Sequence, residues 1–338
     1  MTAHVQPVIH RLVADVGGTN TRVGIVASDG TVAHLARLRN DQHAGLAQAL
    51  KDYLAGLSSV LGTPPVDAAI AVAAPITGTE VRLTNRRDWV FSSESLAQGL
   101  GIGQVHLIND FTAVALCLPW LGEDELQPLG GVARRADRGS SPATPTVVLG
   151  PGTGLGVSAL IPHDAGYVAI EGEGGHATAA AFTEQEAELI AWIREREGHV
   201  SWETLLCGAG LVRLHGAVAT LGGHVGGANV EDAAEVVARA DAGDRVAERS
   251  LQTFFAMLGG FAGDLALSFG AYSGVYLAGG ILPRLRPRLI ASDFRKRFES
   301  KGHYSQLLAS IPTALITAPE PALLGLAAFC PSQVAGAC

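Results

Sequence analysis

The amino-acid sequence predicts an α/β protein with two similar halves. The chain has 338 residues, which is long for a single hydrophobic core and suits two domains. Apolar segments of strand length alternate with longer segments whose apolar residues recur at helical spacing. In each half a strand runs into a glycine turn and then into a second strand, at Gly17 and again at Gly152. These observations together indicate a duplicated fold.

Local signals define the elements of the first half. Asp29-Gly30 favours a tight hairpin turn. The apolar residues between about 44 and 61 form one stripe at helical spacing. Pro75 and Gly78 end a buried strand. The expected strands lie at 12–16, 21–27, 31–38, 68–76 and 105–110, and the expected helices lie at about 44–61 and in the segment FTAVALCLPWL that follows Asp110.

The second half restarts the pattern after the segment 130–145. This segment is rich in Gly, Ser, Pro and Arg and has no periodicity, so we expect a surface loop. Thr183 and Glu186 predict a capping box at the start of a helix. The expected strands are TVVLG (146–150), VSALI (157–161), GYVAI, GVYLAG (274–279) and ALITA, and the expected helices lie near 184–197, 230–241, 244–269 and 284–300 and in PALLGLAAF.

The composition excludes several classes of protein. The net charge is −8 and no basic run occurs, which argues against a nucleic-acid surface. No uninterrupted apolar stretch reaches the ~18 residues of a membrane span, and the N-terminal segment lacks the pattern of a signal peptide. The four cysteines are scattered without zinc-ligand spacing or a disulfide framework. We therefore expect a cytoplasmic protein with reduced thiols.

The two glycine turns are candidate phosphate sites. Glycine lets backbone N–H groups converge on an anion with no Cβ in the way. One such turn is usually only a hairpin turn, whereas two in matching contexts can hold a polyphosphate from both sides. The chain has no G-x-x-x-x-G-K-[ST] motif, and both turns lead into strands rather than helices. A Walker site and a Rossmann site are therefore excluded.

Three acidic or amide side chains end strands of the first half. Asp15 precedes the first glycine turn. A carboxylate beside a triphosphate requires a cation between them, usually Mg²⁺, but Asp15 is alternatively a buried residue that caps its own turn. Asn109 and Asp110 end the strand VHLIND. A carboxylate at that place can accept a proton from a substrate hydroxyl, and the alternative is a pair that only caps the next helix.

Polar residues of the second half suit a sugar. Glu173 and His176 lie in GEGGHA, and Glu203 lies in HVSWETLLCGAG. Carboxylate, imidazole and amide groups match the neighbouring hydroxyls of a sugar, each of which both donates and accepts. One such residue near a glycine is usually part of a surface loop, but three in otherwise apolar regions favour a binding site.

Seven motifs resemble, in order, those of the bacterial ATP-dependent glucokinases of the hexokinase–actin–Hsp70 superfamily. The resemblance runs from Val13 to about Phe329, and such a set in this order rarely arises by chance. The motifs are DVGGTNTR, TNRRDWVFS, LINDFTAVAL, LGPGTGLGVSAL, EGEGGH, CGAGLVRLH and LAGGI.

The resemblance implies two ribonuclease-H-like (actin-like ATPase) α/β domains that flank a cleft. It implies a small domain of 1–110 plus 320–338, a large domain of 111–319, and a homodimer. The implied reaction transfers the γ-phosphoryl of ATP, with Mg²⁺, to the 6-hydroxyl of D-glucose, and Asp110 is the implied catalytic base. The implied sugar ligands are Asn109, Asp110, Glu173, His176 and Glu203. The implied nucleotide ligands are Asp15 (also at Mg²⁺), Gly17, Gly18, Thr19, Asn20, Gly152, Thr153, Gly154, Gly279 and Gly280.

Three details depart from the family pattern or its relatives. The loop 130–145 is longer than the family usually needs, and the RRD segment at 86–88 replaces a less charged one. The related repressor and sugar-kinase group carries a cysteine-rich zinc motif after its His, whereas HATAAAF follows here, so we expect no structural zinc. The alternatives are a kinase for another hexose, a kinase that uses polyphosphate, and a non-catalytic sugar sensor on the same fold.

Overall fold

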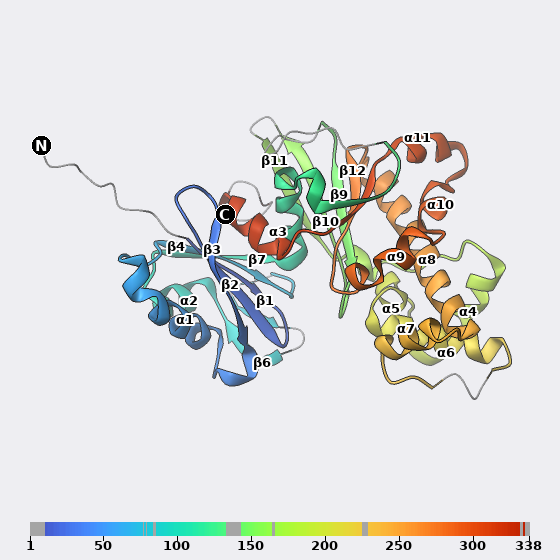
Figure 1. Ribbon diagram of the computed structural model, residues 1–338, viewed down its shortest axis with the longest axis horizontal. Helices are drawn as coiled ribbons and strands as arrows, with labels where there is room; N and C mark the ends of the chain where they lie inside the picture. Colours follow the sequence, from blue (N-terminus) through green and yellow to red (C-terminus); the bar gives the residue numbers. More distant parts are fainter. Residues whose placement is uncertain are drawn as a thin grey trace, which may run out of the picture. The chain divides into compact units, whose positions relative to one another are not determined.

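The chain divides into two compact units. The computed structural model describes residues 11–76, 78, 80–83, 86–132, 143–163, 166–224, 229–331 and 334. Unit 1 comprises Met1–Leu121, Val168–Glu171 and Ala318–Cys338. Unit 2 comprises Gly122–Tyr167 and Gly172–Thr317. Both units combine a sheet with helices, as the sequence predicts for an α/β protein (Figure 1).

A five-stranded sheet with the order β3-β2-β1-β4-β7 forms the centre of unit 1. β1, β2 and β3 are antiparallel neighbours, and β4 and β7 continue the sheet in parallel with β1. The elements are β1 (Arg11–Val16), β2 (Asn20–Val26), β3 (Val32–Arg39), α1 (Leu46–Leu61), β4 (Asp67–Val72), β5 (Val81–Leu83), β6 (Arg86–Phe91), α2 (Ser93–Leu100), β7 (Gln104–Asn109), α3 (Asp110–Cys117) and α12 (Pro321–Ala328).

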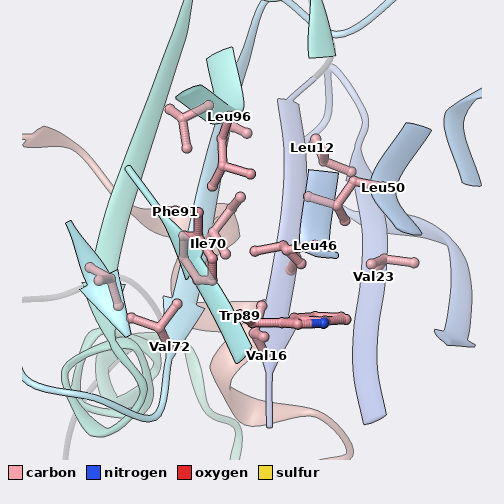
Figure 2. Packing of buried hydrophobic residues seen from close by; sticks show 14 of the residues in the cluster. Leu12, Val16, Val23, Leu46, Leu50, Ile70, Val72, Trp89, Phe91 and Leu96 are labelled. Atoms are coloured by element: carbon pink, nitrogen blue, oxygen red, sulfur yellow. The ribbon is translucent and has the colours of Figure 1, made fainter. Parts of the chain in front are cut away.

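The two faces of this sheet have different covers. Side chains alternate along a strand, so Leu12 and Val16 of β1 enter a core that also holds Leu46 of α1 and Trp89 of β6 (Figure 2). The opposite face of β1, which carries Asp15, contacts α12, and α12 packs in turn on α3. Asp15 therefore lies on the side of the sheet where the first residue of α3 and the start of α12 are found.

A six-stranded sheet with the order β11-β10-β9-β12-β13-β8 repeats this arrangement. β9 pairs with β10 in antiparallel and with β12 in parallel, and β12 pairs with β13 in parallel. The predicted duplication is thus visible in the strand order. The strands are β8 (Leu126–Gly130), β9 (Thr146–Pro151), β10 (Leu155–His163), β11 (Gly166–Gly172), β12 (Gly274–Leu277) and β13 (Thr313–Ile316).

The helices of unit 2 gather around the long helix α8, which contacts α6, α7 and α10. The helices are α4 (Glu184–Glu197), α5 (Trp202–Leu205), α6 (Gly208–Leu221), α7 (Ala233–Asp241), α8 (Arg245–Phe269), α9 (Arg286–Ile290), α10 (Phe294–Glu299) and α11 (Ser305–Ser310). Among the described residues, every helix is too short or too polar to cross a lipid bilayer.

The prediction of one continuous helix near 284–300 is wrong. α9 ends at Ile290 and α10 begins at Phe294. Ser292 explains the break, because its hydroxyl donates to the Leu289 carbonyl (2.7 Å) and accepts from the Phe294 N–H (3.2 Å). A serine side chain that bonds to nearby backbone groups competes with the helix.

The expected capping box at Thr183 is only half formed. The Thr183 hydroxyl accepts the Glu186 N–H at 3.1 Å, as expected. The Glu186 carboxylate instead accepts the Phe182 N–H at 2.8 Å and pairs with Arg297 at 2.6 Å. The pairing with Arg297 joins α4 to α10 and explains why this carboxylate is buried. The expected loop at 130–145 begins one residue later, because Gly130 belongs to β8, and residues 133–142 lie outside the described part of the chain.

Candidate active site

The first glycine turn joins β1 to β2. The Gly17 N–H donates to the Asn20 carbonyl at 3.1 Å, which closes the turn. A Cβ on Gly17 would lie 3.3 Å from that carbonyl oxygen, so a larger residue would crowd the turn. Asn40, the first residue of the 3-10 helix η1 (Asn40–Gln42), lies against this turn and is fully buried. Asn40 was not among the residues predicted from the sequence, because no local pattern distinguishes it.

Asp15 lies at the carboxyl end of β1 in a cluster of charges. Arg22 places its Nη1 3.2 Å from Asp15 Oδ2 and its Nε 2.6 Å from Glu320 Oε2. Burial raises the pKa of Asp15, the nearby Glu320 carboxylate raises it further, and Arg22 opposes both effects. Glu320 precedes α12 with φ +50°, an uncommon left-handed conformation for a residue other than glycine. Arg22 and Glu320 are not among the site residues predicted from the sequence.

Asn109 and Asp110 lie at the same edge of the sheet as Asp15. Asn109 is in register with Val72 of β4, and Val72 is in register with Val16 of β1. Two strand spacings of about 4.8 Å therefore separate Val16 and Asn109, or about 10 Å. The register shows that the first glycine turn and the Asn109-Asp110 pair belong to one edge of unit 1.

The Asn109-Asp110 pair begins α3. Asn109 Oδ1 accepts the N–H groups of Phe111 (2.9 Å) and Thr112 (3.1 Å), so Asn109 is the N-cap that we considered as an alternative. Asp110 is the first residue of the helix rather than the last residue of a strand, which corrects the expected strand 105–110. Its half-buried carboxylate also accepts the Phe111 N–H at 2.8 Å.

The second glycine turn, Gly152-Thr153-Gly154, joins β9 to β10. The Gly152 N–H donates to the Gly154 carbonyl at 2.8 Å, and the Gly152 carbonyl accepts the N–H of Gly208, the first residue of α6, at 3.0 Å. Glu203 Oε2 accepts the Leu155 N–H at 2.7 Å. A Cβ on Gly154 would lie 2.5 Å from the same carboxylate oxygen, so a larger residue here would displace the Glu203 carboxylate.

Gly279 and Gly280 follow β12 and lie beside the second turn. Gly279 has φ +87°, where a side chain is strained, and a Cβ on it would collide with the Pro151 carbonyl. The Ala278 N–H donates to the Leu149 carbonyl at 2.9 Å. Gly279 and Gly280, two of the nucleotide ligands that the resemblance implies, are therefore neighbours of the second glycine turn in unit 2.

The structure brings two of the three candidate sugar ligands of unit 2 together. His176 Nε2 lies 3.5 Å from Glu203 Oε1, with 60% and 30% of their side chains exposed. Glu173 precedes the 3-10 helix η4 (Gly174–His176), and its carbonyl accepts the His176 N–H at 3.0 Å. A Cβ on Gly175 would collide with the Leu155 carbonyl, so η4 packs directly on the strand that follows the second phosphate turn.

Comparison with known proteins identifies the family. The family model described as Glucokinase matches residues 12–333. The chain belongs to the glucokinase family. A glucokinase of Aromatoleum aromaticum is 46% identical over 96% of each chain, and one of Chromobacterium violaceum is 44% identical over 96% of this chain and 90% of its own length. The crystal structure of a glucokinase from an Antarctic psychrotroph is 36% identical, covers 94% of this chain and 98% of that one, and superposes with a TM-score of 0.83.

Membership of the glucokinase family confirms the resemblance drawn from the seven motifs. The candidate site residues of this glucokinase-family chain fall into two sets. Unit 1 holds Asp15, the turn from Gly17 to Asn20, Asn109 and Asp110, and unit 2 holds the turn from Gly152 to Gly154, Gly279, Gly280, Glu173, His176 and Glu203. The side chains of Arg86 and Arg87, two residues of the RRD segment, lie outside the described part of the chain.

Proposed function

We propose that this chain is a hexose kinase that transfers the γ-phosphoryl of ATP to the 6-hydroxyl of D-glucose, giving glucose 6-phosphate and ADP. One observation carries the proposal beyond the family name. Asp110 and the first glycine turn lie at one edge of unit 1: they directly follow Asn109 and Val16, whose backbones the strand register separates by about 10 Å. A proton acceptor and a phosphate site at this separation suit a sugar hydroxyl that attacks a bound phosphate.

Asp110 is the proposed general base. Its carboxylate takes the proton of the sugar 6-hydroxyl while that oxygen forms a bond to the γ-phosphorus. The bond from the γ-phosphorus to the bridging oxygen breaks, and ADP leaves with that oxygen. Asn109 caps α3 with its Oδ1 and thereby holds the backbone of Asp110 in one place. The proposed sugar ligands Asn109, Glu173, His176 and Glu203 orient the acceptor hydroxyl.

The two glycine turns and Asp15 are the proposed nucleotide ligands. Backbone N–H groups of both turns donate to phosphate oxygens. Among the described residues, no group of three or more His, Cys, Asp or Glu side chains is placed to hold a metal. Asp15 alone, paired with Arg22, fits Mg²⁺ that keeps its own waters and takes its other ligands from the phosphates. Bound Mg²⁺ would neutralise the charge that develops on the phosphates.

The finer architecture and the assembly also belong to this proposal. The repeated strand order supports two ribonuclease-H-like domains. Three expectations stay predictions: the homodimer, the cytoplasmic location, and the division into a small domain (1–110 plus 320–338) and a large domain (111–319).

A coupled assay for ADP release tests the function directly. The purified protein is given ATP and Mg²⁺ with glucose, mannose, galactose, fructose or N-acetylglucosamine in turn. We expect glucose to give the highest kcat/KM, and we expect excess EDTA to abolish activity until Mg²⁺ is restored. A higher kcat/KM for another hexose would show that this hexose, not glucose, is the substrate. Turnover only with polyphosphate would show that polyphosphate, not ATP, is the donor. Sugar binding without any phosphoryl transfer would favour the sensor instead.

A further inference from the structure

Asn40 is a buried polar residue whose position the proposed mechanism does not yet use. It follows β3 in the chain and is completely excluded from solvent. Its side chain lies against the first glycine turn, which is more than 20 residues away in sequence. A buried amide is costly unless its donors and acceptor are satisfied, so its partners indicate what holds it there.

The Asn40 side chain and backbone N–H bond to the turn and to the residue after it. Its Nδ2 donates to the carbonyls of Gly17 (2.8 Å) and Gly18 (3.2 Å). Its backbone N–H donates to the Thr19 carbonyl at 3.0 Å. Its Oδ1 accepts the hydroxyl of Thr21, also fully buried, at 2.8 Å. One residue thus holds three successive carbonyl groups of the turn.

The direction of these carbonyls determines the direction of the neighbouring amides. In a planar trans peptide the C=O of one residue and the N–H of the next point in opposite directions. Because the carbonyls of Gly17 and Gly18 point toward Asn40, the N–H groups of Gly18 and Thr19 point away from it. These are the N–H groups that a phosphate at this turn would use.

We propose that Asn40 is a positioning residue for nucleotide binding: it orients the Gly18 and Thr19 amides of the first glycine turn toward the phosphates of ATP. The inference rests on the proposed kinase function. Asn40 is completely buried and its side chain bonds to the turn and to Thr21, so it acts through the turn. A glycine turn is otherwise free to rotate its peptide planes, and Asn40 removes that freedom before the nucleotide arrives.

Asn40→Asp tests the proposal with almost no change of shape. The carboxylate still accepts the Thr21 hydroxyl, but it has no N–H to donate and faces two carbonyl oxygens. We expect the KM for ATP to rise about tenfold or more, while the glucose-induced rise in melting temperature stays as in the wild type. A variant with unchanged KM and kcat for ATP overturns the proposal.

Thr21→Val is the matched control. It removes the other hydrogen bond of the Asn40 side chain while both bonds to the turn carbonyls remain. If Asn40 orients the turn, Thr21→Val lowers the melting temperature but changes the KM for ATP less than threefold. If Asn40 is only a buried structural residue, both variants lower the melting temperature and neither changes the KM for ATP. That outcome contradicts the proposal.

A measurement on the wild type keeps the proposal testable if Asn40→Asp does not fold. Amide resonances of Gly18 and Thr19 are followed by NMR while ADP and Mg²⁺ are added to ¹⁵N-labelled protein. We expect both resonances to shift strongly and the exchange of both amide protons with solvent to slow. Unchanged resonances at saturating ADP overturn the role of Asn40. Wild-type protein that releases no ADP from ATP in the presence of any hexose overturns the kinase function itself, which is a separate outcome.

Discussion

Asn109 and Asp110 are adjacent in sequence but take different structural roles. Asn109 accepts two backbone N–H groups and so ends the strand and begins the helix. Asp110 is already part of α3, and its half-buried carboxylate lies at the sheet edge that carries the first glycine turn. The cap thus contributes rigidity, while the neighbouring carboxylate is the one proposed for proton transfer.

Asp110→Asn separates the chemistry from the fold. The amide keeps the shape and can still accept the Phe111 N–H, but it cannot take a proton from the sugar. We expect kcat to fall by about 10² to 10⁴, the usual contribution of a general base, with glucose binding retained in calorimetry. Glu188→Gln, at an exposed position of α4, is the control and should match the wild type. Near-normal kcat in Asp110→Asn would remove Asp110 from this role.

At the scale of elements, close packing of α12 on α3 supports the edge that carries the proposed base. A Cβ on Gly325 of α12 would collide with the Ala113 carbonyl and lie 3.0 Å from the Cys117 nitrogen, both in α3. At the two ends of α12, Arg11 donates to the Phe329 carbonyl at 2.6 Å and Glu320 pairs with Arg22. Glycine at 325 is therefore the condition for the close approach of the two helices.

Gly325→Ala should force α12 and α3 apart. Overpacking of this kind costs about 1–3 kcal/mol, so we expect a lower free energy of unfolding in urea and a lower kcat, because α3 begins at Asp110. Gly56→Ala is the matched control, since Gly56 is an exposed position of α1 with nothing near its Cβ. The control should gain about 0.5–1 kcal/mol from helix propensity. Equal stability of the two variants would show that α12 and α3 are not in tight contact.

Helix α1 is joined to the edge strand β3 by Tyr53, whose hydroxyl donates to the His34 carbonyl at 2.7 Å. His34 has φ +54° and lies where the pairing of β2 with β3 shifts register. Burial raises the pKa of Tyr53 to about 12 from its ordinary value of 10.0. The folded state therefore favours the neutral phenol.

This shift predicts a loss of stability at alkaline pH. Below pH 10 the phenol is neutral in both states and its contribution is fully present. Between pH 10 and 12 the unfolded state releases the proton while the folded state keeps it, so the free energy of unfolding falls as pH rises. Urea unfolding from pH 9 to 11.5 should show a shallower decline in Tyr53→Phe than in the wild type. Parallel curves for the two proteins would contradict the shift.

At the scale of the whole molecule, the proposed sugar ligands are distributed over both units. Asn109 and Asp110 belong to unit 1, and Glu173, His176 and Glu203 belong to unit 2. A ligand that binds only the folded protein stabilises it by mass action, by about 2.7 kcal/mol at a hundredfold excess over Kd. If the proposed assignment is right, glucose binding stabilises each unit that supplies ligands.

Calorimetry with and without glucose examines this expectation. Saturating glucose should raise the melting temperature of every unfolding transition of the wild type. Glu173→Ala removes a proposed hydroxyl acceptor at an exposed position, so it should reduce the rise while the melting temperature without glucose stays the same. Glu188→Gln again serves as the control. If glucose leaves all transitions of the wild type unchanged, the proposed sugar ligands are wrong.

Local patterns were sufficient for much of the fold. The strands β1, β2, β9 and β10 and both glycine turns follow from apolar periodicity and from glycine, which depend only on neighbouring residues. The helices α2 and α6 were not predicted. α2 has a Ser92 N-cap and is followed by Gly101, so its start and stop signals are present in the sequence and were overlooked. α6 carried a weaker signal, because its cap is the Cys207 sulfur and its first turn holds two glycines.

The sequence by itself determined the α/β class, the duplication, the glucokinase motifs and the proposed ligands, since each motif lies within one short segment. Only the tertiary structure revealed Asn40 under the first turn, Glu320 beside Arg22 and the close contact of Gly325 with α3. These pairs are distant in sequence, and side chains that meet only after the sheet has formed leave no periodic pattern. Such contacts depend on strand order and register, which are set by packing of the whole unit.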